Sequence, residues 1–253
     1  MINKDTNTGW GGVASWYDDL LETGSSYQKD VILPDLMGIL SLQKGERVLD
    51  LACGQGFFAR AFKTAGAEVV GADISHELID IAKNYEKAGS AISYFIAPSH
   101  KLDFLQDNSI DKITIVLALQ NIEDVTATFK ECSRVLKSAG TLVMVLNHPA
   151  FRIPQESAWG FDDKKNIQYR RVDKYMSEFK VSINMHPGED KPVFTPSFHR
   201  PLQYYFKALK SSGFLVRTLH ELISNKTSVG KRAQAENQSR NEIPMFMTIE
   251  AVK

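Results

Sequence analysis

Two aspartates and a pair of glycines form the first arrangement in this sequence that could do chemistry. Asp50 lies in the apolar stretch V-L-D-L-A, and Gly54 and Gly56 follow directly. A strand, a glycine turn and a helix are how an α/β sheet builds a nucleotide-type pocket. The glycines let a ligand approach the backbone closely, because they carry no Cβ. The Asp50 carboxylate would repel a pyrophosphate and attract a ligand with an ammonium and a sulfonium.

A second carboxylate, Asp73, ends the stretch E-V-V-G-A-D. It lies about 20 residues past the glycine turn, where a ribose-binding carboxylate is expected. The alternatives are a strand-end residue that caps backbone amides for Asp50 and a turn residue for Asp73, but their joint spacing favours a ligand site. NAD is the competing cofactor, because the segment from Gly54 to Ala59 also matches G-x-G-x-x-A. A lone match of this kind is weak, and Asp50 opposes it.

Two histidines lie where a general base would be useful. His148 follows a predicted strand, at the sheet edge where open α/β sheets bind ligands. His199 leads through Arg200 into a helix that Pro201 can begin, and Arg200 could hold an anion bidentately. The alternatives are a structural histidine in a turn and a plain helix N-terminus. Cys53 has no identifiable base, so we expect it to pack rather than to act as a nucleophile.

Length and composition bound the class of protein. The chain has 253 residues, 43% of them apolar, and Lys plus Arg equals Asp plus Glu at 30 each. This predicts one large α/β domain with insertions, or a core and a cap, and no broad nucleic-acid footprint. Two cysteines and no zinc spacing predict neither a disulfide framework nor a metal site. No apolar run approaches ~18 residues, so we expect no membrane span and a cytoplasmic location.

Alternating patterns predict a mostly parallel sheet with helices between its strands. The expected strands are 48–52, 68–73, 92–96, 111–119, 141–146, 214–223 and 244–252, and the expected helices lie in 10–21, 27–42, 57–65, 75–85, 123–137 and 202–209. Ser75 is expected to cap the fourth of these helices. The polar link 224–242 is predicted to be a mobile surface loop.

Residues 148–200 do not fit one more strand–helix unit. They are rich in proline and aromatic residues, which is typical of an inserted cap or lid. Its apolar lining would favour a planar or lipophilic small-molecule acceptor. Residues 1–44 are expected to form an N-terminal helical segment over the cofactor site, with the core in 45–147 and 201–253. The pattern leaves the oligomeric state open.

The ordered set of motifs resembles the class I S-adenosylmethionine-dependent methyltransferases, and within them the small-molecule type that includes the ubiquinone and menaquinone biosynthesis enzymes. V-L-D-L-A-C-G-Q-G is similar to the first family motif, V-V-G-A-D-I-S to the second, L-K-S-A-G-T-L-V-M-V to the segment entering strand five, and K-S-S-G-F to the C-terminal signature. The resemblance covers residues 45–146 and 200–253.

What the resemblance implies is a Rossmann-like sheet with an antiparallel C-terminal strand. It also implies S-adenosylmethionine as cofactor, S-adenosylhomocysteine as product, and methyl transfer to an oxygen, nitrogen or carbon of a small organic acceptor. The alternative from another class is a protein that binds these ligands as a non-catalytic partner or regulatory subunit.

The resemblance also implies roles for single residues. Asp50 would lie near the methionine end of the cofactor, Ala52, Gly54 and Gly56 would shape the loop, Asp73 would bind the ribose hydroxyls, Ile74 would pack on the adenine, and the Leu117 backbone would meet the amino group. Tyr17 would close over the cofactor, with simple helix packing as the alternative. Pro98 replaces the usual acidic adenine contact, with Ser99 and His100 as neighbouring substitutes. His148 and His199 remain the candidate bases.

Overall fold

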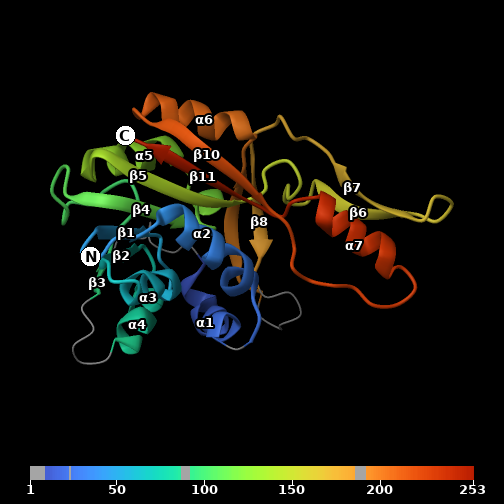
Figure 1. The fold of residues 1–253 in the computed structure, drawn as a ribbon, viewed down its shortest axis with the longest axis horizontal. Coiled ribbons are helices and arrows are strands. Elements are labelled where there is room, and N and C mark those ends of the chain that lie inside the picture. Colours follow the sequence, from blue (N-terminus) through green and yellow to red (C-terminus); the bar gives the residue numbers. More distant parts are fainter. Residues whose placement is uncertain (1–8, 23, 87–91, 186–191) are drawn as a thin grey trace.

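A seven-stranded sheet forms the centre of the molecule (Figure 1). The computed structural model describes residues 9–22, 24–86, 92–185 and 192–253, and part of the predicted N-terminal segment, 1–8, lies outside them. The sheet order is β10-β11-β5-β4-β1-β2-β3. Its strands are β1 (Arg47–Leu51), β2 (Glu68–Asp73), β3 (Ser93–Ile96), β4 (Ile110–Val116), β5 (Leu136–Asn147), β10 (Leu215–Leu222) and β11 (Phe246–Val252). Strands β1 to β5 pair in parallel, whereas β11 is antiparallel to β5 and β10. The predicted mostly parallel sheet with an antiparallel C-terminal strand is confirmed.

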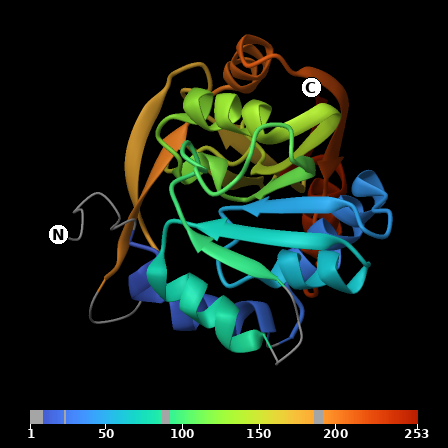
Figure 2. The ribbon, with the colours of Figure 1, turned by 90° about the vertical axis from the view of Figure 1, so that its left-hand side faces the viewer.

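Helices cover both faces of this sheet (Figure 2). They are η2 (Gly11–Val13), α1 (Ala14–Glu22), the π-helix η3 (Gln28–Ile32), α2 (Leu33–Leu40), α3 (Phe57–Thr64), α4 (His76–Tyr85), η4 (Leu119–Asn121), α5 (Val125–Val135), α6 (Leu202–Ser211) and α7 (Ala233–Glu242). One core cluster joins α5 and α6 to the sheet, with Phe129 and Leu209 fully buried. A second joins α2, α3 and α4, with Leu36 and Phe62 fully buried. In the helices of these two clusters, the apolar residues whose spacing predicted the helix form the face that is buried against the sheet.

Two segment boundaries differ from the prediction because the backbone turns without help from Gly or Pro. Strand β4 ends at Val116, since Leu117 adopts a left-handed φ of 52° and η4 follows. Strand β5 starts at Leu136, directly after α5, although 138–140 was expected to be a turn. Ala139 has a φ of 61°, and the pairing of β5 with β4 shifts register there. By contrast, Ser75 caps α4 as predicted, because its hydroxyl accepts a hydrogen bond from the Leu78 amide.

The link 224–242 contains the helix α7, so the prediction of a mobile loop throughout was wrong. Helix α7 packs on β7 (Ile167–Val172). The buried residues of α7 are the small Ala235 and Ser239, and the Ser239 hydroxyl donates to the Gln168 carbonyl at 2.8 Å. A helix that docks through small and polar residues has no apolar stripe for sequence reasoning to find.

Residues 148–200 form two antiparallel hairpins. The first pairs β6 (Ser157–Asp162) with β7, and the second pairs β8 (Phe179–Asn184) with β9 (Phe194–His199). In Figure 1, the first hairpin and α7 extend together beyond the end of the central sheet. Many of the aromatic residues in this insertion point outward, since Trp159, Tyr169 and Phe194 are 42%, 48% and 53% exposed. They therefore do not give the insertion the apolar lining that its composition predicted.

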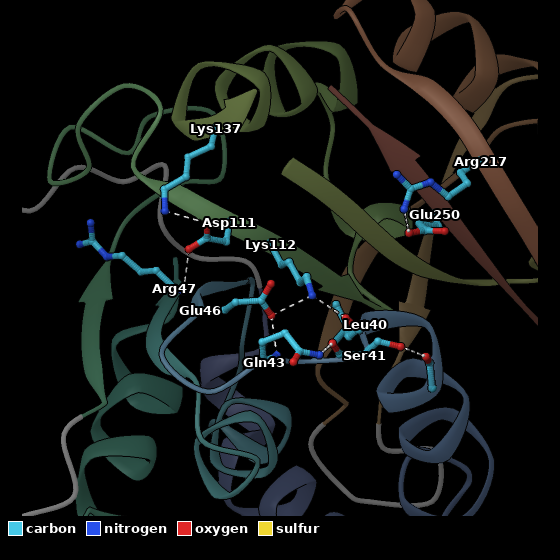
Figure 3. A network of polar contacts seen from close by, with 11 residues as sticks. Leu40, Ser41, Gln43, Glu46, Arg47, Asp111, Lys112, Lys137, Arg217 and Glu250 are labelled. Atoms are coloured by element: carbon cyan, nitrogen blue, oxygen red, sulfur yellow. Dashed lines mark hydrogen bonds and ion pairs between the residues drawn. The ribbon is translucent and has the colours of Figure 1, made fainter. Parts of the chain in front are cut away.

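The amino ends of β1 and β4 are joined by charged side chains (Figure 3). Lys112 donates from Nζ to Glu46 at 2.8 Å and to the Leu40 carbonyl at 2.7 Å. Asp111 accepts from the Arg47 amide at 2.9 Å and from Lys137 at 2.7 Å. These contacts hold the edge of the sheet opposite the carboxyl ends, so one edge has a structural role and the other is available for a site.

Within the described ranges, none of the helices has the length and apolar character that crossing a bilayer requires. The same part of the chain contains no group of three or more His, Cys, Asp or Glu residues arranged for a metal ion.

Candidate functional site

Two neighbouring cavities lie at the carboxyl edge of the sheet. The first, which we call the glycine-loop pocket, is lined at the ends of β1, β2 and β4 by Tyr17, Asp50, Ala52, Gly54, Asp73, Ile74 and Leu117, among others. It continues at Ala52, Asp73 and Ile74 into a space lined by Pro98, Ser99 and His100. The second cavity, the hairpin chamber, has a volume of about 400 Å³. Trp10, Tyr17, Leu117 and Asn121 line both the pocket and the chamber, so the two cavities meet there.

Asp50 presents a carboxylate oxygen that has no hydrogen-bond partner in the described residues. Its side chain is buried, and Thr114 donates to Oδ1 at 2.9 Å, whereas Oδ2 has no partner. Burial raises the pKa of Asp50 to about 7, and the Thr114 hydrogen bond opposes that rise. A buried carboxylate oxygen with no partner costs free energy that a donor or a cation would offset. The glycine-loop pocket therefore suits a positively charged ligand group.

Asp73 holds the loop in place with the same carboxylate that was predicted to bind ribose. Oδ2 accepts from the Gly54 amide and Oδ1 from the Ser75 amide, each at 2.9 Å. Burial raises the pKa of Asp73, and backbone N–H groups, that of Ser75 first, oppose the rise. Each carboxylate oxygen accepts more than one hydrogen bond, so both can still receive hydroxyl donors from a ligand.

The two loop glycines do different things. Gly54 has a φ of 55° and lines the pocket, where an added Cβ would lie 3.7 Å from the Tyr17 ring. Gly56 has a φ of 82° and precedes α3, but an added Cβ would collide with the Tyr94 hydroxyl. Gly56 is absent from the lining of either part of the pocket. The structure thus gives Gly56 a packing role and leaves the approach of a ligand to Gly54 and to Ala52, which has a φ of 57°.

Tyr17 stands between the two cavities. Its ring meets Trp10 edge-on, with centroids 5.3 Å apart. Burial raises the pKa of Tyr17 to about 12, so its phenol is neutral at physiological pH. Leu117 lies across from the loop with its left-handed backbone, and its carbonyl accepts from the Gln120 amide group. The structure therefore places both Tyr17 and Leu117 in the lining of the pocket.

The space beside Pro98 receives residues from the inserted hairpins. Lys180 of β8 and Phe198 of β9 line it together with Ser99 and His100. The Ser99 hydroxyl lies 2.8 Å from the Thr128 hydroxyl, and His100 is exposed. Glu123 and Asp124 also line this space. Sequence reasoning missed them, because they follow β4, and β1 and β2 separate β4 from β3, the strand that precedes Pro98.

The two candidate bases lie outside the glycine-loop pocket. His148 is buried with Nε2 at 2.8 Å from Glu221, and its Nδ1 accepts from the Ala150 amide at 3.2 Å. These contacts favour the structural alternative. His199 lines a small cavity next to the chamber, and its Nε2 donates to the Tyr175 carbonyl at 2.8 Å. Burial lowers the pKa of His199, which favours the neutral ring, and Nδ1 makes no hydrogen bond to the described residues.

Sequence reasoning misplaced the arginines. Arg200, a candidate anion ligand, is buried and donates to the carbonyls of Leu119, Ile122 and Glu123. Arg170, to which the sequence assigned no role in a site, lines the chamber together with Arg152. The residues that alternate with Arg170 on β7, Tyr169 and Arg171, point outward. An apolar-inside pattern would have assigned the faces of β7 the other way round, so no sequence signal identified Arg170.

The known proteins that this chain resembles include methyltransferases in each of three comparisons. A model of the methyltransferase domain matches residues 49–144. A protein of Haemophilus influenzae is 29% identical over 174 residues, which cover 66% of this chain and 68% of that protein. A demethylmenaquinone methyltransferase of Staphylococcus haemolyticus is 32% identical over 143 residues, which cover 55% of this chain and 59% of that enzyme. The alignment thus spans less than two thirds of the Staphylococcus enzyme.

The fold comparison covers more of the chain. The crystal structure of an S-adenosylmethionine-dependent methyltransferase from Mesorhizobium loti has a TM-score of 0.67 at 26% identity and covers 87% of this chain and 96% of its own. A protein from Listeria monocytogenes, described as a putative methyltransferase of the same kind, has a TM-score of 0.66 at 24% identity, over 86% of this chain and 97% of its own.

Proposed function

We propose that the chain is a class I S-adenosylmethionine-dependent methyltransferase, which its matching domain and its fold support, and that it methylates an oxygen, nitrogen or carbon of a small organic molecule bound in the hairpin chamber. The observation that carries this proposal is the junction of the two cavities at Tyr17 and Leu117. One cavity has the carboxylates that suit the donor, and the other opens beside it with room for a small acceptor. Pockets that bind small molecules typically have volumes of roughly 300–1,000 Å³.

The residues of the glycine-loop pocket fit the cofactor. S-adenosylmethionine, when bound, supplies a methyl group activated by its positively charged sulfur. Asp50 offers its unpartnered oxygen to a cationic group of this ligand, and Asp73 offers its remaining lone pairs to the ribose hydroxyls. Ile74 supplies an apolar surface where the pocket continues toward Pro98. Ser99 and His100 are the side chains there that we propose for the adenine end.

The main task of the protein in this reaction is positioning. Holding two reactants close and aligned in a dry site can remove roughly 7–11 kcal/mol of barrier. Tyr17 and Trp10, from the N-terminal segment, cover the junction. The hairpins supply the remaining walls of the chamber, which makes 148–200 the acceptor-binding insertion in this proposal. If the acceptor is a hydroxyl, His199 is the better placed base, because its Nδ1 has no partner among the described residues and its cavity adjoins the chamber.

The alternative is a non-catalytic partner that only binds the cofactor. A chamber walled off from the pocket by the insertion would favour it. Because the two cavities share lining residues, the enzyme is the better supported function.

Isothermal calorimetry with S-adenosylmethionine, S-adenosylhomocysteine and NAD tests the pocket first. Binding of both adenosyl ligands and not NAD is expected, followed by methyl transfer from a labelled donor in an acceptor screen. Binding of NAD alone, or of none of the three ligands, would overturn the proposal.

A further inference from the structure

Two guanidinium groups in the hairpin chamber have no acidic partner among the residues that the structure describes. Arg152 follows β5, Arg170 lies on β7, and both line the chamber. Of the residues described for this cavity, none is an aspartate or a glutamate. Neighbouring basic residues differ in this respect, since Arg171 pairs with Asp173 at 2.7 Å and Lys174 with Glu156 at 2.6 Å. The chamber therefore holds an uncompensated positive charge.

The Arg152 guanidinium packs against an aromatic ring and makes no hydrogen bond to the described residues. Its guanidinium carbon lies 5.0 Å from the centre of the Phe246 ring. Burial lowers the pKa of Arg152, and the charge of Arg170 lowers it further. Two like charges partly removed from water repel each other, and such an arrangement costs free energy unless an anion enters. The same cost makes the pair a ready anion receptor.

Arg170 is oriented so that part of its guanidinium stays available. Nε donates to the Phe151 carbonyl at 2.7 Å, and Nη2 donates to the Ser157 hydroxyl, also at 2.7 Å. Ser157 in turn donates to the Ile153 carbonyl at 2.9 Å. These bonds fix the plane of the guanidinium, and Nη1 has no hydrogen-bond partner within the described part of the chain. A planar guanidinium with free N–H groups matches a carboxylate or a phosphate.

We propose that Arg152 and Arg170 form an oxyanion subsite, so that the methyl acceptor is a small molecule that carries a carboxylate or a phosphate. This inference rests on the proposed function, because it assigns the chamber to the acceptor. Neither arginine lines the glycine-loop pocket. The anionic group is therefore held away from the junction at Tyr17 and Leu117, and it orients the acceptor without being the atom that is methylated.

The test uses the full chain saturated with S-adenosylhomocysteine and three matched probes: benzoate, phenyl phosphate and the neutral benzamide. Calorimetry at low salt is expected to show at least one anion binding tenfold or more tightly than benzamide, with an affinity that falls as salt is added. Arg152→Gln and Arg170→Gln should each lower the affinity for that anion about tenfold, as expected for the loss of hydrogen bonds to charged groups. Arg171→Gln, one residue along β7 on its outer face, is the control and should bind like the wild type.

Stability must be separated from recognition. Arg152→Gln loses no hydrogen bond to a described residue, whereas Arg170→Gln loses those to Phe151 and Ser157. Arg170→Lys and thermal melts of every variant therefore accompany the titrations, and unchanged affinity for S-adenosylhomocysteine shows that the fold is intact.

The outcomes separate the oxyanion subsite from the proposed methyltransferase function. Preference for benzoate or for phenyl phosphate identifies the anion and supports the subsite. Equal binding of all three probes, binding of none of them, or equal losses in Arg171→Gln would overturn the subsite while S-adenosylhomocysteine still binds. Failure of the wild type to bind S-adenosylhomocysteine would remove the proposed function, and this inference with it.

Discussion

The glycine-loop pocket and the hairpin chamber carry opposite charges. The first has the buried carboxylates of Asp50 and Asp73 and receives no Lys or Arg along the β1, β2 and β4 ends. The second has Arg152 and Arg170 and no acidic residue among those described for its lining. Only uncharged residues, Tyr17 among them, line both. A cationic donor and an anionic acceptor would each find the complementary charge, so the two sides would select the two ligands and set their order across the junction.

The two cavities also differ in how they are built. The pocket comes from consecutive strand ends of the sheet, where the backbone is fixed by parallel pairing on both sides of β1. The chamber is lined by the two hairpins, the segment after β5, the N-terminal helical segment and the turn after β4 that includes η4. A fixed cofactor site beside an inserted acceptor site is an arrangement in which acceptor choice can change while the donor site stays the same.

Asp73→Ala is expected to have the largest effect on the pocket. The change removes the proposed ribose contact and also releases the Gly54 and Ser75 amides that Asp73 holds. Loss of hydrogen bonds to a charged group predicts a decrease in S-adenosylhomocysteine affinity of about a hundredfold. Calorimetry measures it, with the exposed Asp103→Ala as control. Unchanged affinity would remove Asp73 from the site and end the comparison of the two cavities.

Tyr17 tests whether the two cavities are separate. Tyr17→Ala removes a wall that both share, so we expect S-adenosylhomocysteine to bind about tenfold more weakly, as for loss of a buried aromatic contact. Tyr17→Phe keeps the ring and should stay close to the wild type. Equal losses in both variants would show that the hydroxyl, and not the wall, is what matters.

The sequence predicted the features that neighbouring residues specify, and it missed those that depend on residues far apart in the chain. The sheet, most helix positions and the places of Asp50 and Asp73 in or at the end of their strands were predictable, because neighbouring residues alone specify a strand that ends in a turn. The roles of Asp50, Asp73 and Tyr17 stay predictions. The packing role of Gly56 was not, because it depends on Tyr94, a residue 38 positions away that only the folded sheet brings close. Helix α7 and the inward side of β7 were missed for a related reason. Both bury small or polar residues, and hydrophobic periodicity carries no signal for those.

The pH dependence of cofactor binding sharpens the charge of the pocket. Without ligand, Asp50 keeps its proton up to about pH 7, because burial raises its pKa from 3.8. A cationic ligand needs the ionised form, so affinity should fall about tenfold between pH 8 and pH 6. Asp50→Asn should show a weaker dependence on pH, and calorimetry of both proteins across that range is the measurement. Parallel pH profiles would mean that Asp50 does not face the charge of the ligand.

The raised pKa of Asp50 also predicts how the stability of the folded protein changes with pH. The folded state holds the Asp50 proton more tightly than the unfolded chain does, since the folded pKa is the higher one. This carboxyl therefore contributes stability below about pH 4, and the contribution is lost as the pH rises toward 7. Chemical unfolding of the ligand-free protein at pH 5 and pH 8 should show a smaller loss in Asp50→Asn than in the wild type. An equal loss in the two proteins would assign the effect to other groups.

His148 gives the smallest expected effect on turnover and the clearest contrast with the residues at the junction. The sequence placed it where a base would be useful, but its ring bonds to Glu221 and the Ala150 amide and lies outside the lining of the pocket and the chamber. His148→Ala should therefore lower the free energy of unfolding by about 1 to 3 kcal/mol, as for a buried hydrogen-bonded group. Turnover measured well below the melting temperature should stay within about twofold of the wild type, a change of about 0.5 kcal/mol or less in the barrier.

Glu221→Gln, which keeps the shape of the partner, separates the hydrogen bond to the Glu221 carboxylate from the packing of the ring. A large loss of turnover in a folded His148→Ala protein, with cofactor affinity retained, would show that the base acts from outside both cavities and that their junction does not contain all of the chemistry.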